Sequence, residues 1–211
     1  MLSPSGERLL EVAAEVFYTE GIRATGVDTL VARAGVSKPT LYAQFGSKEN
    51  LVAAVLDRRR VARQQALSAF LARHDTAGEG RLLAVFDWLA AGHGRSGFRG
   101  CPFTNAAVEL PDPAHPARAV ISAYKDWLRS TLTALAAEAG LADPDELGLQ
   151  LLLLIDGANA RVVVADDRSA MRLAGRAAAK LIAQARRGET PSGAPRRRRS
   201  GKPAPTATTR G

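Results

Sequence analysis

Apolar side chains recur every three or four residues along most of this chain, and this spacing constrains its fold more than any other feature. Such a repeat places apolar side chains on one face of an α-helix, whereas a half-buried strand requires strict alternation. We find no convincing run of β-branched residues that alternates in this way. The sequence therefore predicts an all-α protein of about nine helices.

Capping residues divide the first part of the chain into four predicted helices. Each begins at a residue whose side-chain oxygen can accept a hydrogen bond from a free backbone N–H group. These residues are Ser5, Thr25, Ser37 and Ser47, and the helices are expected to end near Gly21, Gly35, Gly46 and His74. The third helix carries Pro39 in its first turn, where a missing N–H costs nothing.

Five further helices are predicted in the rest of the chain. They are expected over residues 81–91, 103–110, 117–139, 145–165 and, capped by Ser169, up to about residue 187. A loop rich in Gly and Arg separates the first two, and PDPAHP at residues 111–116 breaks the chain. Residues 188–211 have almost no large apolar groups, which predicts a disordered basic tail.

The net charge of +8 lies almost entirely in the last part of the sequence. Residues 186–211 hold eight basic residues and one acid, whereas residues 1–50 hold five basic residues and six acidic ones. A prediction of DNA binding therefore depends on where individual side chains lie rather than on total charge.

Two short predicted helices joined by a glycine turn, over residues 25–46, have the geometry of a helix-turn-helix. In the second, Leu41 and Phe45 lie four residues apart and should face inward. The side chains expected to face outward, toward a major groove, are Lys38, Thr40, Gln44 and, at the edge, Tyr42.

The stretch from Leu10 to Val55 resembles the DNA-binding domain of the TetR family. Its centre reads FYTEGIRATGVDTLVARAGVSKPTLYAQFGSKENLVAAV, in which GVS precedes a TLYxxF recognition helix and SKExL opens a long helix. The resemblance implies DNA contacts from Thr25, Ser37, Lys38, Pro39, Thr40, Tyr42 and Lys48. It also implies three domains: a helix-turn-helix at 1–50, a ligand-binding and dimerisation domain at 51–187, and the tail at 188–211.

Each predicted DNA contact has a plainer interpretation. Thr25, Ser37 and Ser47 would also serve purely as helix caps, worth about 1 kcal/mol each, and Pro39 as a helix starter. Base and phosphate contact are equally open for Lys38 and Thr40. Gln44 is a candidate base contact from its outward position alone, whereas phosphate contact is favoured for Tyr42 and Lys48.

Relatives in this family use their last two helices to form a four-helix bundle with a second subunit. The helix at 145–165 is apolar nearly all round and needs cover on both sides, although a monomeric core helix is the alternative. The interface residues that we predict are Leu151, Ile155, Ala158, Val162, Ala174, Ala178 and Leu181. A two-fold dimer would place its recognition helices about 34 Å or a multiple apart, which predicts a pseudo-palindromic operator in double-stranded DNA.

The sequence GFRGCPFTNAAVELPDPAHP at residues 97–116 resembles a subset of the family with a G-C-x-x-x-N-x-x-x-E segment. Ligand sites are mostly apolar with a few polar groups, which predicts a pocket lined by Trp88, Cys101, Phe103, Asn105, Tyr124 and Trp127. Aromatic residues at helical spacing more often belong to a plain core. Cys101 is either a thiol that senses oxidants or electrophiles or a small buried residue.

These features predict a sequence-specific regulator, a repressor released from its operator by a small-molecule effector. An architectural DNA-binding protein without an effector is the alternative. We find no nucleophile elbow, phosphate loop or paired carboxylates, and we expect neither an enzyme nor a cofactor. No metal site is expected, since His93 and His115 lack ligand-like spacing. No secretory signal or membrane-spanning stretch is seen, so we expect a cytoplasmic protein, associated with the nucleoid when bound to DNA.

Overall fold

The computed structural model describes residues 2–73 and 77–188, where the chain forms nine α-helices and no strand. The helices are α1 Pro4–Thr19, α2 Val27–Ala34, α3 Lys38–Phe45, α4 Lys48–Arg73, α5 Glu79–His93, α6 Pro102–Glu109, α7 Pro116–Glu138, α8 Pro144–Ala165 and α9 Ala170–Arg186. The predicted all-α fold is confirmed, with helix ends shifted by at most two residues. The predicted helix end at His74 and, beyond Gly188, the predicted tail lie outside the described residues.

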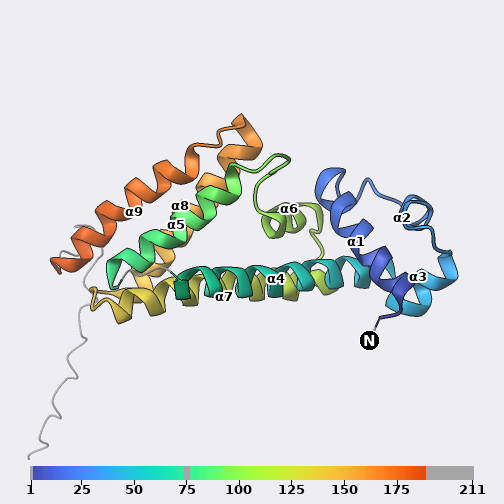
Figure 1. Ribbon diagram of the computed structural model, residues 1–211, viewed down its shortest axis with the longest axis horizontal. Helices are drawn as coiled ribbons and strands as arrows, with labels where there is room; N and C mark the ends of the chain where they lie inside the picture. Colours follow the sequence, from blue (N-terminus) through green and yellow to red (C-terminus); the bar gives the residue numbers. More distant parts are fainter. Residues whose placement is uncertain (1, 74–76, 189–211) are drawn as a thin grey trace, which may run out of the picture.

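Two long helices, α4 and α7, lie side by side along the molecule (Figure 1). Helices α1, α2 and α3 gather around the N-terminal end of α4 and form what we call the head. At the other end, α8 packs against α7 and α9, and α9 also contacts α5. The short helix α6 packs on α7 and lies between the head and the helices α5, α8 and α9. We call all helices outside the head, α4 to α9, the body.

Local capping explains where several helices begin. The Ser37 hydroxyl accepts a hydrogen bond from the Thr40 N–H at 3.3 Å, and the Ser47 hydroxyl accepts one from the Asn50 N–H at 3.1 Å, as predicted. The first helix begins earlier than predicted because Ser3, not Ser5, caps it, accepting from the N–H of Gly6 at 3.1 Å.

Two other predicted caps are wrong. Thr25 precedes α2, but its hydroxyl donates to the Gly21 carbonyl at 2.7 Å, and Gly26 occupies the N-cap position instead. Ser169 precedes α9, but its hydroxyl donates to Asp167 and forms no cap. In both cases a nearby oxygen from the preceding loop takes the hydroxyl.

The buried apolar residues form two clusters, and their boundary differs from the predicted domain boundary at residue 50. The first cluster combines the head and the start of α4 with α6 and the first half of α7, through residues such as Phe103, Ile121 and Tyr124. The second holds the rest of α4 with α5, α8, α9 and the second half of α7. Trp127 packs against both clusters. The apolar packing therefore joins α6 to the head.

Helix α8 is long and apolar enough to cross a membrane by length and composition alone, with a mean hydropathy of 1.5. The sequence predicts no membrane-spanning stretch by the criterion of an uninterrupted run of apolar residues. Helix α8 contains a few polar residues and so has no such run. The core helix of a soluble protein passes the same test, and α8 packs against α7 and α9. Only 39% of its most apolar 18-residue stretch is buried within one chain. Part of α8 is thus left without cover.

The predicted interface residues are not on that uncovered side. Six of them are buried in the core of a single chain and Leu181 is partly buried against it; the six are Leu151, Ile155, Ala158, Val162, Ala174 and Ala178. Exposed small and apolar residues on α8 include Leu149, Leu153, Gly157, Ala160 and Val164, which we call the open face, and Arg161 and Val163 are exposed beside them. A helix that is apolar nearly all round does not reveal which side its own chain covers, and this explains the error.

Candidate DNA-binding face and ligand cavity

Helix α3 presents a mixed polar and aromatic surface to solvent. Ser37, Lys38 and Pro39 are exposed at its N-terminal end, and the side chain of Tyr42, one turn later, is 50% exposed. Leu41 and Phe45 are buried against the rest of the head, as predicted. The helix therefore offers a surface of the size and polarity that suits a major groove.

Lys38 already has an anionic neighbour within the head. Its ammonium lies 2.6 Å from a carboxylate oxygen of Asp28 on α2, and both side chains are more than half exposed. The hydrogen bond and charge of Asp28 raise the pKa of Lys38. An exposed pair of this kind is weak in water, so Lys38 can exchange Asp28 for a phosphate.

Thr25 and Gln44 are placed differently from their predicted role as DNA contacts. Thr25 is buried, with 2% of its surface exposed, and its hydroxyl is engaged with the Gly21 carbonyl. The Gln44 side chain is turned toward α1, where its carbonyl accepts the Ser3 N–H at 3.0 Å. A methyl group at Gly6 would lie 2.6 Å from that oxygen. Gln44 thus joins α3 to α1.

A carboxylate of α6 fastens the loop that follows α1. Glu109 Oε2 accepts the backbone N–H groups of Ile22 at 2.7 Å and of Arg23 at 3.0 Å. The Lys48 ammonium, predicted to contact phosphate, donates to the Ile22 carbonyl at 2.7 Å. Both polar groups of Ile22 are therefore held, one from α6 and one from the start of α4.

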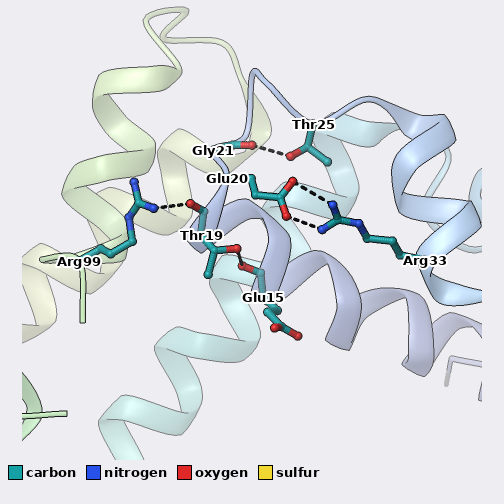
Figure 2. Close-up of polar contacts among 7 residues, drawn as sticks. All are labelled: Glu15, Thr19, Glu20, Gly21, Thr25, Arg33 and Arg99. Atoms are coloured by element: carbon teal, nitrogen blue, oxygen red, sulfur yellow. Dashed lines mark hydrogen bonds and ion pairs between the residues drawn. The ribbon is translucent and has the colours of Figure 1, made fainter. Parts of the chain in front are cut away.

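A second set of bonds joins α1 to the loop before α6. The Tyr18 hydroxyl donates to the Gly100 carbonyl at 3.0 Å and accepts the Arg99 N–H at 2.7 Å. Figure 2 shows Arg99 donating to the Thr19 carbonyl from the side of this loop. We call these contacts and those of Glu109 the joint between the head and the body.

Figure 2 also shows how α1 is tied to α2 within the head. Arg33 places both terminal nitrogens on the carboxylate of Glu20, and the Thr19 hydroxyl donates to the Glu15 carbonyl at 2.9 Å. Because the Arg33–Glu20 pair is exposed, it contributes little to stability. Its two-pronged geometry nevertheless orients α2 against α1.

Three residues of the G-C-x-x-x-N-x-x-x-E segment have structural roles at the joint. Gly100 has φ +80°, and a side chain there would lie 2.6 Å from Val163, so glycine is needed at this close approach. Asn105 donates to the Arg99 carbonyl at 2.8 Å, and Glu109, one turn later, holds the loop after α1. The sequence displayed this segment, but gave no signal that its glutamate would bind the head.

The aromatic residues predicted to line a pocket pack on one another instead. Phe103 and Tyr124 are stacked with ring centroids 3.8 Å apart, and Trp127 lies 5.7 Å from Tyr124. Arg63 donates to the Tyr124 hydroxyl at 3.1 Å and lies over the Trp88 ring. These side chains thus have one another and Arg63 as neighbours where α4, α5, α6 and α7 meet.

A cavity lies at the joint. It has a volume of about 920 Å³ and is bounded by α1, the first half of α4, α6 and the C-terminal end of α8. Its lining includes Asn105 but none of the other five residues predicted for the pocket. We call it the joint cavity.

A smaller cavity of about 200 Å³ lies next to it, under the loop that follows α5. His93 lines it and is buried, with Nε2 3.1 Å from the Asn159 Oδ1. Since the Asn159 amide nitrogen donates to the Ile155 carbonyl, Oδ1 is an acceptor and Nε2 carries the proton. His93 Nδ1 is buried without a hydrogen-bond partner among the described residues.

Cys101 occupies the N-cap position of α6 and is 7% exposed. A buried thiol is poorly accessible to oxidants and electrophiles. The burial therefore favours the packing role over the sensing role, and the sensing role stays a hypothesis.

The comparisons with known proteins decide the family. A family model described as "Bacterial regulatory proteins, tetR family" matches residues 9–55, and one described as "Tetracyclin repressor-like, C-terminal domain" matches residues 78–178. The chain belongs to the TetR family. The crystal structure of a TetR-family transcriptional regulator from Streptomyces coelicolor is similar to it, with a TM-score of 0.81 and 33% sequence identity, over 86% of this chain and 96% of that one.

Two curated relatives match a shorter segment. The HTH-type transcriptional activator FasR of Mycolicibacterium smegmatis is 52% identical over 58 residues, 26% of this chain and 26% of that protein. The HTH-type transcriptional repressor ComR of Escherichia coli is 39% identical over 66 residues, 31% of this chain and 28% of that protein. The chain thus aligns with little more than a quarter of either relative. This TetR-family chain is a DNA-binding transcriptional regulator, and its relatives are regulators rather than enzymes.

Proposed function

We propose that the protein is a homodimeric repressor that leaves a pseudo-palindromic operator when a small-molecule effector binds to it. The joint cavity is the observation that carries this proposal. Its walls come from both the head and the body, so a bound molecule contacts both at once. A ligand that prefers one arrangement of the joint over another shifts the position of α3, and about 3 kcal/mol of such preference lowers operator affinity roughly a hundredfold.

The open face of α8 supports the dimer. Leu149, Leu153 and Val164 recur at helical spacing with the small residues Gly157 and Ala160 between them, and all five are exposed. Leu173 on α9 is also exposed. A second copy of the chain, packed on α8 and α9, would cover these apolar side chains and hold two heads at a fixed separation.

On the DNA side, we assign direct contact to Ser37, Lys38, Pro39, Thr40 and Tyr42 of the head. Thr25 and Lys48 hold the loop after α1 in place, and Gln44 holds α3 against α1. In this proposal residues 1–50 bind DNA, residues 51–187 bind the ligand and form the dimer, and residues 188–211 are a basic tail. Most of the tail lies outside the described residues. Regulators of this family are generally cytoplasmic, and the bacterial chromosome lies in the same compartment. The proposal therefore includes association with the nucleoid when the protein is bound to DNA.

One matched relative is named an activator and the other a repressor, so kinship leaves the sign of regulation open. We choose repression because release by a ligand needs only DNA binding and one conformational change. Activation would also need a surface for RNA polymerase.

Selection of binding sites from random duplex DNA, at a stated salt concentration, tests the proposal. We expect an inverted repeat with half-sites separated by about one helical turn or a multiple of it. A reporter gene behind that site should be silenced by the full chain. Binding without sequence preference, or a gain of reporter expression, would contradict the proposal and favour an architectural protein or an activator, respectively.

A further inference from the structure

Four arginines lie within two turns of α4, and they differ in their partners. Arg58 pairs with Glu7 at 2.9 Å, and Arg60 pairs with Asp57 at 2.6 Å. Arg59 and Arg63, which are four residues apart, form no ion pair with any residue of the described ranges 2–73 and 77–188. Like charges at this spacing on a helix repel one another. Arg63 donates a hydrogen bond to the Tyr124 hydroxyl. Of these two arginines, Arg59 therefore has the fewer polar partners.

The Arg59 guanidinium lies 4.8 Å from the centre of the Tyr18 ring and lines the joint cavity. The described part of the chain offers it no hydrogen-bond acceptor. Its partial burial lowers its pKa, and the charge of Arg63 acts in the same direction. A partly desolvated cation without an anion is costly, and a bound anion would remove that cost.

The remaining walls of the cavity show what the anion would be attached to. Apolar side chains of the head and of α4 form one side, among them Phe17, Ile22, Val55 and Leu56. A cavity of about 920 Å³ falls in the size range of small-molecule sites. Its shape and lining suit an apolar chain or ring rather than a bare ion.

Three carboxylates and two further arginines, Arg99 and Arg168, also line the cavity. Glu20 is engaged by Arg33, Asp166 by Arg168, and Glu109 by two backbone N–H groups. Arg99 is engaged by the Thr19 carbonyl and Arg168 by Asp166, so Arg59 is left as the cation for a ligand. A single cation balances a singly charged carboxylate better than a doubly charged phosphate. The planar guanidinium also matches a carboxylate with two parallel hydrogen bonds.

We infer that the joint cavity binds an amphipathic monocarboxylate, with its carboxylate on Arg59 and its apolar part against Phe17, Val55 and Leu56. This inference rests on the proposed function, since it names the chemical class of the effector. The ligand lies between α1 and α6, beside the bonds of Tyr18 and Glu109 that fasten the head. Occupancy of the cavity therefore acts directly on the joint.

Calorimetric titration of the full chain with decanoate and with decanol provides the test, because the two probes share an apolar chain and differ in charge. We expect decanoate to bind at least about tenfold more tightly, as a charge-assisted pair implies. Arg59→Gln should abolish this difference while binding of decanol persists, and Arg59→Lys should keep part of it. Arg60→Gln is the matched control, since Arg60 pairs with Asp57, and it should behave like the wild type.

Equal binding of the two probes to the wild type, or an unchanged preference in Arg59→Gln, would overturn the inference. Val108→Trp places a large side chain in the cavity from its exposed rim and should weaken both probes. Thermal unfolding of each variant shows that it is folded. Operator binding, measured with and without decanoate, separates the two claims. If decanoate binds through Arg59 but does not release the operator, the effector model alone is contradicted. If decanoate releases the operator equally well from Arg59→Gln, this inference alone is contradicted.

Discussion

The head and the body differ in how completely one chain covers its own apolar residues. Within residues 2–46, Tyr42 is the one large apolar side chain left exposed, and it lies on the recognition helix. In α8 and α9, by contrast, Leu149, Leu153, Val164 and Leu173 are all exposed. The head needs only DNA to complete its surface, whereas the body needs another apolar surface. The proposed dimer contact would cover the apolar side chains that one chain leaves exposed.

Leu153→Arg should sharpen this comparison most strongly. The side chain is 63% exposed, so the substitution leaves the fold of one chain intact but places a charge in the proposed interface. We expect monomers in analytical ultracentrifugation and a loss of operator affinity of more than about a hundredfold, since two half-sites are no longer bound together.

Leu151→Ala is the matched control for that variant. Leu151 is fully buried in one chain, so its truncation should destabilise the fold by about 2–5 kcal/mol without a direct effect on a partner surface. A Leu153→Arg protein that remains dimeric would contradict the assignment of the open face.

Substitutions on the head should change DNA affinity without changing association. Lys38→Ala is expected to weaken operator binding about tenfold, the effect of one lost contact. Asp28→Asn removes the carboxylate that competes for Lys38 and should strengthen binding by a smaller factor. Fluorescence anisotropy at fixed salt measures both. Changes of the same sign in the two variants would argue against a DNA contact by Lys38.

Glu109→Gln tests whether the joint contributes to stability. The carboxylate accepts two backbone N–H groups, and its neutral replacement is expected to cost about 1 kcal/mol, or about 2–4 °C in Tm. Glu138→Gln removes an exposed partner of Arg81 and should change Tm far less. Equal shifts in the two variants would mean that the joint is no stronger than a surface ion pair.

The smallest effect is expected from His93 in the body. Burial lowers its pKa in the folded protein, so the unfolded chain binds the proton more readily. His93 therefore contributes stability that is present above its unfolded pKa of about 6.5 and is lost as pH falls below that value. His93→Gln should flatten the pH dependence of the free energy of unfolding between about pH 7 and pH 5, measured with urea. Parallel pH profiles of variant and wild type would exclude this contribution.

The head could be predicted closely from the sequence because its signals are local. A serine before Lys38, a proline in the first turn and apolar residues four apart fix α3 with little help from the rest of the fold. Thr25 was misjudged because its hydroxyl has two possible partners, and the loop that supplies Gly21 decides between them. The contact of Gln44 with Ser3 could not be predicted because Ser3 lies 41 residues away in the chain.

In the body the pattern was less informative. Periodicity identifies α8 as apolar but cannot distinguish Leu151, which faces its own chain, from Leu153, which does not. The helical spacing of Phe103 and Tyr124 likewise does not reveal that the two rings stack on each other. The joint cavity itself depends on contacts between α1, α6 and α8, and no short stretch of sequence contains those contacts.

The shared apolar cluster of the head, α6 and the first half of α7 has a consequence for exchanging parts between related regulators. A chimera cut at residue 50 would leave Phe103, Ile121 and Tyr124 facing a foreign head. Recombination that preserves function therefore has to transfer residues from three separate stretches of the chain together. The helix-turn-helix, α6 and the first half of α7 are, in that sense, one unit of exchange.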